Sequence, residues 1–157
     1  MNTTTTITSD AITKIIEINA PLSRVWRALT DHEQFGAWFR VRIDGPFVAG
    51  KRSTGNILVP GFEHIKWNST VRRIEPEHHF SYTWHPYAKD ADKDYSVEEP
   101  TLVEFTLEAT KTGTRLKVVE SGFDKVPAYR RDEAFRMNSG GWAAQLENIK
   151  RYVEQKA

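Results

Sequence analysis

The sequence predicts one α+β domain in which an antiparallel sheet of about six or seven strands is combined with two short helices after the first strand and a long C-terminal helix. Three observations lead to this fold class. Apolar residues alternate with the period of a strand between residues 47 and 123. They follow helical spacing in residues 20–39 and again after Pro127. The chain of 157 residues, 39% of them hydrophobic, is long enough to enclose one core.

The first ordered part of the chain is expected to be a strand followed by two helices. Residues 11–20 are rich in β-branched side chains and end before a proline, as a strand does. Residues 20–30 then place their apolar side chains at helical spacing. Residues 31–39 begin with Asp31, a residue that caps helix N-termini well, and predict a second short helix.

The middle of the chain predicts the rest of the sheet. Residues 63–75 and 79–85 alternate between two faces, as strands with one buried face do. Residues 101–123 form the clearest hairpin, with its turn at Gly113. Residues 86–100 are charged and have no apolar period, so we expect a loop. The sequence leaves open whether this loop is a lid over a cavity.

The last part of the chain predicts a single long helix. Its apolar stripe, with intervals of 7, 4, 3 and 4 residues, consists of Phe135, Trp142, Leu146, Ile149 and Val153. Gly140 and Gly141 interrupt this helix just before Trp142. We expect the glycines to let the helix bend or pass close to the sheet backbone, and Trp142 to fill the volume under the sheet.

Composition excludes several classes of protein. Lys and Arg number 22 against 21 Asp and Glu, so the basic excess of a nucleic-acid surface is missing. The chain has no cysteine, which is compatible with a reducing cytoplasm. No apolar run approaches the length of a membrane span, and the first residues do not resemble a signal peptide. We therefore expect a cytoplasmic protein with a disordered tail at 1–10, a domain at 11–157, and no membrane or nucleic-acid partner.

No motif for catalysis, cofactor binding or metal binding has its required spacing in this sequence. His78 and His79 follow a turn and are expected to be solvated. His64 and His85 fall on strands without the second histidine or carboxylate that a metal site needs. We expect no catalytic residue, no metal and no cofactor.

Three stretches resemble the START-like superfamily, also called SRPBCC, and within it the branch named after the activator of Hsp90 ATPase. They are residues 18–39, 101–123 and 138–153, and together with the strand order they cover nearly the whole chain from residue 11. The resemblance implies a helix-grip fold, related to Bet v 1, in which a curved antiparallel sheet wraps around the C-terminal helix. It also implies an elongated apolar cavity between sheet and helix, and functions as diverse as carriers, cyclases and a chaperone activator.

Glu120 is the most unusual polar residue of the predicted core. By strand parity it points to the same side as Leu116 and Val118. A carboxylate there needs a partner. One interpretation is a salt bridge that ties the strand end to the last helix; the other is a polar anchor or an acid/base group in a ligand pocket. The candidate ionic partners are Arg130, Arg131 and Arg136.

Aromatic side chains on the predicted strands and the last helix are expected to line one concave surface. The chain has 5 tryptophans, and we weigh two roles for this cluster, ordinary core filling and the wall of a small-molecule site. The candidate ligand-binding residues are Trp67, Tyr82, Trp84, His85, Phe105, Glu120 and Trp142.

These observations favour a protein that binds a small hydrophobic or aromatic molecule in an internal cavity without converting it. One alternative is a co-factor of an Hsp90-type chaperone, as the branch name suggests, or a partner protein in a stress response. The other is an enzyme similar to polyketide cyclases or hydrolases. The sequence is compatible with a monomer or a homodimer.

Overall fold

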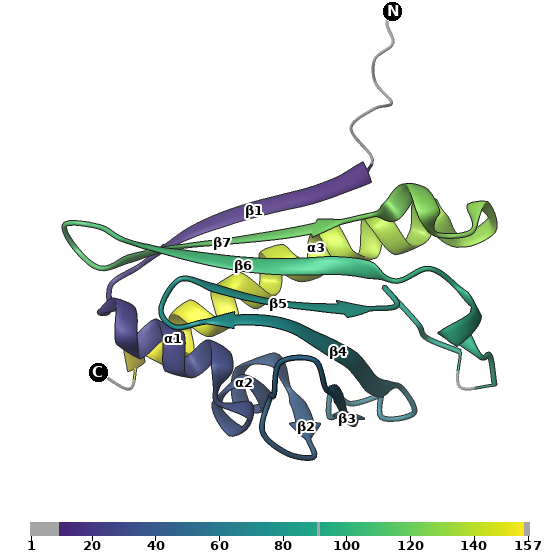
Figure 1. Cartoon of the computed structure of the whole chain (residues 1–157), viewed down its shortest axis with the longest axis horizontal. Coiled ribbons are helices and arrows are strands. Elements are labelled where there is room, and N and C mark those ends of the chain that lie inside the picture. Colours follow the sequence, from purple (N-terminus) through teal and green to yellow (C-terminus); the bar gives the residue numbers. More distant parts are fainter. Residues whose placement is uncertain (1–9, 91, 156–157) are drawn as a thin grey trace, which may run out of the picture.

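The computed structural model describes residues 10–90 and 92–155, so that the predicted tail lies outside the described residues apart from Asp10. The elements of the described chain, including two short 3-10 helices η2 and η3, are shown in Figure 1. They are β1 (Ala11–Ile18), α1 (Leu22–Thr30), α2 (His32–Phe39), β2 (Val41–Ile43), β3 (Arg52–Ile57), β4 (Lys66–Glu75), β5 (His79–Trp84), η2 (Tyr95–Val97), β6 (Thr101–Ala109), β7 (Thr114–Ser121), η3 (Phe123–Lys125) and α3 (Ala128–Gln155).

One curved sheet of seven strands forms the frame, in the order β1-β7-β6-β5-β4-β3-β2. Every neighbouring pair is antiparallel. The long helix α3 crosses behind one face of this sheet, and α1 and α2 lie together at one end of the helix (Figure 1). The predicted α+β helix-grip fold is therefore confirmed.

The two short helices close one end of the layer between sheet and α3. Asp31 caps α2 as predicted, because its side chain accepts from the backbone N–H groups of Glu33 and Gln34. Trp38 and Phe39 point inward and are 4% and 8% exposed. The indole N–H of Trp38 donates to the carbonyl oxygen of Ala28 at 2.8 Å, which joins α2 to α1.

The core lies between the inner face of the sheet and α3, and its residues follow the predicted periods. On β4, Trp67 and Val71 are buried while the residues next to them are exposed or half-buried, and on β6 buried residues alternate with half-buried ones. On α3 the predicted stripe is buried at Trp142, Leu146, Ile149 and Val153, and Phe135 is partly buried. Each large apolar side chain moved out of water contributes about 1.5–3 kcal/mol to folding.

The predicted role of Gly140 and Gly141 is wrong in one respect. A Cβ atom built at either position has no neighbour within 4 Å, so no sheet backbone approaches the helix there. Both glycines are exposed. The close approach occurs instead at Gly113 in the β6–β7 turn, where a Cβ would collide with the carbonyl oxygen of Ile18.

His79 also differs from its prediction. It is the first residue of β5 and is only 6% exposed, instead of lying in a solvated turn beside His78. Burial, followed by the positive charge of Arg73, lowers the pKa of His79, although Glu104 opposes this.

Candidate functional site

A large cavity opens where β4 and β5 separate. It has a volume of about 1020 Å³ and is lined by the sheet, by residues of the connections 58–65 and 85–100, and by the middle of α3. β5 ends at Trp84, which pairs with Ser69, so residues 66–68 of β4 have no partner on β5. The sheet therefore has an opening at this point.

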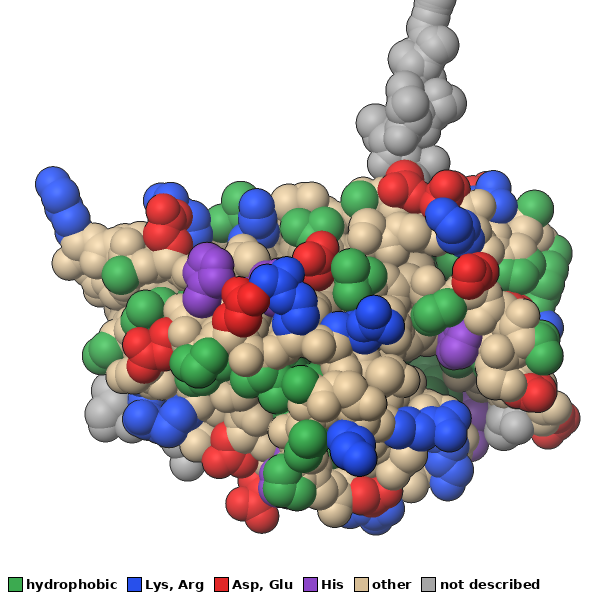
Figure 2. Space-filling view, viewed as in Figure 1, with side chains coloured by type: hydrophobic (Ala, Val, Ile, Leu, Met, Phe, Trp, Pro, Cys, Tyr) green, Lys and Arg blue, Asp and Glu red, His purple; other side chains and the backbone are tan. Residues whose placement is uncertain are grey.

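The cavity reaches through this opening. Trp67 and Ser69 line it from the inner face of β4, and Lys66 and Asn68 line it from the outer face. The space-filling view shows the hollow on the right of the sheet-side surface, within a face of interspersed acidic and basic side chains (Figure 2). Charged side chains therefore lie around the entrance, and the interior is reached between β4 and the 85–100 connection.

Aromatic rings form the inner wall. The ring centroids of Trp67 and Trp84 lie 5.4 Å apart, and Phe39 lies 5.4 Å from Trp67 and 6.3 Å from Trp84. All three residues line the cavity. Edge-to-face contacts at these distances hold aromatic rings in fixed orientations. The wall is therefore a preformed apolar surface.

Apolar side chains also surround the mouth. Phe62 on the 58–65 connection is 49% exposed and Met137 on α3 is 44% exposed, and both line the cavity. Ile65 and Val59 line the same side. Large apolar side chains exposed together at a cavity mouth are typical of binding sites for apolar molecules.

Glu120 on β7 lies directly behind the aromatic wall and is 0% exposed. Its Oε1 accepts from Asn138 Nδ2 at 2.9 Å and from Trp142 Nε1 at 2.8 Å. Its Oε2 accepts from Trp84 Nε1 at 2.8 Å and from Thr101 Oγ1 at 2.5 Å. Four neutral donors thus satisfy the carboxyl group from three other elements, which is what a buried carboxylate requires.

The predicted salt bridge of Glu120 is therefore wrong. Glu120 is linked to the last helix by the side chains of Asn138 and Trp142. The arginines that were its candidate partners bind elsewhere: Arg130 pairs with Glu98, and Arg131 donates to the Val126 carbonyl oxygen. The Glu120 charge has an effect on a neighbour, because burial and then this carboxylate raise the pKa of Tyr82 well above its ordinary value.

The seven predicted site residues divide into two layers. Trp67, Trp84 and His85 line the cavity. The other four lie behind it: Tyr82, Phe105 and Trp142 in the aromatic core, and Glu120 as described above. Ligand contact by any of the seven stays a prediction.

Most of the lining residues were not predicted, and four of them lie beside the aromatic wall or on the helix that faces it. Phe39 comes from α2, Ser69 from β4, and Asn138 and Gly141 from α3. Strand parity had already placed Ser69 beside Trp67, so its position was available from the sequence. Nothing in the sequence pointed to Asn138, whose role depends on the rotation of α3 against β7.

A buried ion pair holds the 85–100 connection to the start of α3. Arg130 donates to Glu98 Oε1 from Nη2 at 2.7 Å and from Nε at 3.0 Å, and to the Pro86 carbonyl oxygen at 2.7 Å. The two charged side chains are 9% and 6% exposed. Burial works against the ionised form of Glu98, but the Arg130 hydrogen bond and charge hold the pKa of Glu98 below its ordinary value. His85 Nε2 lies 2.9 Å from the Glu98 carbonyl oxygen and strengthens this anchor.

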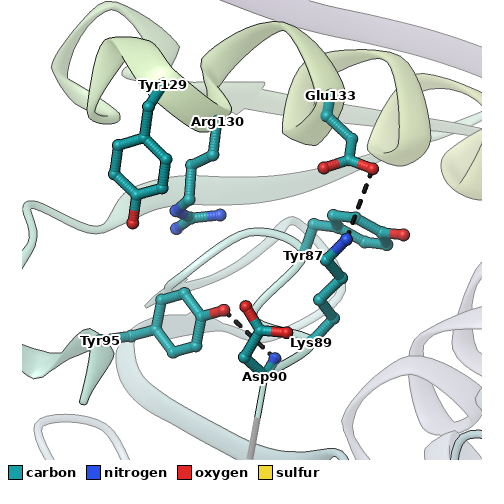
Figure 3. A pocket seen from close by; sticks show the side chains of 7 residues that line it. All are labelled: Tyr87, Lys89, Asp90, Tyr95, Tyr129, Arg130 and Glu133. Atoms are coloured by element: carbon teal, nitrogen blue, oxygen red, sulfur yellow. Dashed lines mark hydrogen bonds and ion pairs between the residues drawn. The ribbon is translucent and has the colours of Figure 1, made fainter. Parts of the chain in front are cut away.

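A smaller hollow of about 210 Å³ lies between this connection and α3 (Figure 3). Lys89 reaches across it to Glu133 at 3.5 Å, and the Asp90 N–H donates to the Tyr95 hydroxyl at 3.2 Å. Tyr87, which lines both hollows, has a left-handed φ of 51°, a strained conformation for a bulky residue. The polar groups of this hollow pair with one another. We interpret these pairs as contacts that hold the 85–100 connection against α3.

Two searches of the described residues bear on other functions. In residues 10–90 and 92–155, no three His, Cys, Asp or Glu side chains are grouped to hold a metal ion. None of the helices in this part of the chain has the length and apolarity needed to cross a membrane.

Comparisons with known proteins agree with the fold. Residues 19–154 match the family described as Activator of Hsp90 ATPase homolog 1-like protein. The crystal structure of MLL2253 from Mesorhizobium loti is 25% identical, with a TM-score of 0.74 over 94% of this chain and 98% of that one. NE0264 from Nitrosomonas europaea is 18% identical, with a TM-score of 0.71 over 94% and 96%. A protein from Arthrobacter aurescens is 15% identical, with a TM-score of 0.73 over 97% and 90%. No curated protein matches the chain significantly.

Proposed function

Because the chain belongs to the Activator of Hsp90 ATPase homolog 1-like family, whose fold commonly binds ligands, we propose that it binds a small hydrophobic or aromatic molecule in the cavity between sheet and α3. The open cavity with its wall of Phe39, Trp67 and Trp84 carries this proposal. Binding is the whole activity proposed, without conversion of the ligand, in the cytoplasm.

The dimensions of the cavity support this function. Pockets for drug-sized molecules have volumes of about 300–1,000 Å³ and are mostly apolar with a few polar groups. The cavity here, of about 1020 Å³, is large enough for such a molecule. Affinity would come from burial of apolar surface, at about 25 cal/mol per Å² before the costs of association.

Two measurements test the proposal. Native mass spectrometry of protein purified from cytoplasmic extract should show a co-purifying small molecule. The neutral dye N-phenyl-1-naphthylamine should become brighter on binding, and aromatic ligands should change the tryptophan emission, because Trp67 and Trp84 line the cavity. The absence of both a co-purifying molecule and a dye signal would contradict the proposal.

The α3 glycines supply a cavity-filling variant and its matched control. Gly141 lines the cavity and has open space around a built Cβ, so Gly141→Leu should place its side chain in the cavity and weaken dye binding at least tenfold. Gly140 has the same open space but is not part of the lining, and Gly140→Leu should bind as the wild type does. Equal binding by the two variants would place the ligand elsewhere.

The name of the matching family gives a second candidate, stimulation of an Hsp90-type ATPase. An ATPase assay with the Hsp90 of the host tests it, and lack of stimulation at saturating protein would remove it. The cyclase or hydrolase alternative is tested in the same mass spectra, since a bound molecule whose mass changes during incubation would favour an enzyme.

A further inference from the structure

We propose that ligands enter and leave the cavity by movement of the 58–65 connection, and that a hydrogen bond between His64 and the Lys89 carbonyl oxygen is the latch that keeps this connection closed. The inference rests on the proposed function and adds the route by which the ligand exchanges. The 85–100 connection, whose role as a lid the sequence left open, is the fixed side of this entrance.

The opening in the sheet is a window with both of its ends closed. Residues 66–68 of β4 form one side, and the first residues of the 85–100 connection form the other. One end is closed by the last residue pair between β4 and β5. At the other end, His64 Nε2 lies 3.2 Å from the Lys89 carbonyl oxygen and joins the two connections. His64 lines the cavity, as do the residues on either side of Lys89.

This window is small compared with the space behind it. Three residues of a strand extend about 10 Å. The side chains of Lys66, Asn68 and His85 line the same part of the cavity and narrow the window further. A molecule that fills a cavity of about 1020 Å³ therefore passes only when the window widens, and release of the end at His64 widens it.

The 85–100 connection is fastened to α3 on the side away from the window. Arg130 binds Glu98 in a buried ion pair, and Lys89 reaches across to Glu133 at 3.5 Å (Figure 3). Separating the first pair would leave a buried charge without a partner, which is strongly unfavourable. This connection is therefore expected to stay in place when the ligand exchanges.

The 58–65 connection is held mainly by hydrogen bonds within itself. The Phe62 N–H donates to the Val59 carbonyl oxygen at 2.9 Å, and the Ile65 N–H donates to the Phe62 carbonyl oxygen at 3.0 Å. Apart from the His64 bond, its hydrogen bonds to other described residues go to β3 and to the residue that follows α2. It can therefore turn about its base as one unit once His64 is released.

The latch is weak enough to open repeatedly. A carbonyl oxygen only accepts, so His64 donates from Nε2. His64 is exposed, and water replaces the bond when the connection moves away. Loss of one such bond should raise the open fraction by about two- to tenfold. Because ligands use the same opening in both directions, association and dissociation should become faster by the same factor.

Stopped-flow fluorescence with N-phenyl-1-naphthylamine tests the latch. We expect His64→Ala to raise the association and dissociation rate constants together by about two- to tenfold, with the dissociation constant unchanged. His64→Gln should remain near the wild type, because its amide N–H can donate to the same carbonyl oxygen. His78→Ala is the control, since this exposed histidine lies in the β4–β5 turn, and it should change neither rate constant.

Reversible cross-links test which connection moves. The chain has no cysteine, so an introduced pair can be joined by a bis-methanethiosulfonate reagent and released by reduction. Joining His64→Cys to Lys89→Cys should slow both rate constants at least about tenfold, and reduction should restore them. Joining Lys89→Cys to Glu133→Cys is the matched control. It fastens the same connection to α3 and should leave the rate constants unchanged.

The outcomes separate this inference from the proposed function. If the dye binds but the first cross-link leaves exchange unchanged, or the control cross-link slows it equally, the route is wrong and ligand binding stands. If His64→Ala changes the dissociation rate constant alone, His64 contacts the ligand and is not a latch. If the dye fails to bind to the wild type, the proposed function is wrong and the inference fails with it.

Discussion

The four hydrogen bonds to Glu120 make the effect of Glu120→Gln predictable. Each carboxylate oxygen accepts from one indole N–H, Trp142 on Oε1 and Trp84 on Oε2. Glutamine replaces one of these oxygens by an NH₂ group, which donates. Whichever way the amide is oriented, its NH₂ group must face an indole N–H, and an indole nitrogen cannot accept.

The cost can be worked from these contacts. The second donor on each oxygen can adapt, because the Thr101 hydroxyl can rotate and the Asn138 amide can flip to present its oxygen. One buried indole N–H remains unpaired at about 1–3 kcal/mol, and the remaining bonds lose the charge that makes them stronger than neutral ones. We expect Glu120→Gln to lower the free energy of unfolding by about 2–4 kcal/mol, a large part of the total for one domain.

Urea unfolding followed by tryptophan fluorescence and by circular dichroism measures this change. Glu108→Gln is the control, because this β6 side chain is 70% exposed and its ion pair with Arg115 lies on the surface. It should change stability by less than about 1 kcal/mol. If Glu120→Gln is as stable as Glu108→Gln, the carboxylate does not hold the two indoles and the reasoning is wrong.

Three other changes test the anchor, the helix and the buried histidine. Arg130→Met should destabilise the protein by about 3–5 kcal/mol in urea unfolding because Glu98 stays buried and unpaired, and adding Glu98→Leu should restore most of the loss. Gly141→Leu should raise the midpoint of thermal unfolding, since leucine is better than glycine in a helix by about 0.5–1 kcal/mol and its Cβ has free space; a lower midpoint would mean that the space is filled. The lowered pKa of His79 means that the unfolded chain binds more protons, so stability should fall as the pH decreases from about 6.5 toward the folded-state pKa. His79→Gln should flatten this slope, and an unchanged slope would assign it to other groups.

Hydrophobic periodicity was enough to predict the order of strands and helices and the direction of individual side chains, while the helix-grip arrangement was implied by the family resemblance. Alternation predicted that Trp67 and Val71 point inward on β4 and that Glu120 points inward on β7. All three side chains are buried in the structure, as this prediction requires. The partners of Glu120 could not be predicted in this way. They come from β5, β6 and two turns of α3, and their meeting depends on how the helix is rotated over the sheet.

The cavity was harder to predict than the fold because it depends on where pairing stops. The alternating pattern continues through His85, but β5 ends at Trp84, and the opening beside residues 66–68 follows from that end. The close backbone contact predicted at Gly140 and Gly141 was wrong for a related reason. A glycine in a helix is compatible either with close backbone contact or with empty space, and Gly141 lies beside empty space.

The structure gives a physical reason why the space beside the aromatic wall stays open. An apolar cavity of this size would be reduced if Trp84 or Trp142 turned into it, because each indole would gain contacts. Both indole N–H groups are instead held by the two oxygens of Glu120, and turning either ring would leave a buried carboxylate oxygen with one donor fewer. The polar cluster behind the wall therefore opposes collapse of the apolar surface in front of it. On this reasoning a variant at position 120 should weaken ligand binding even though the carboxylate lines no part of the cavity.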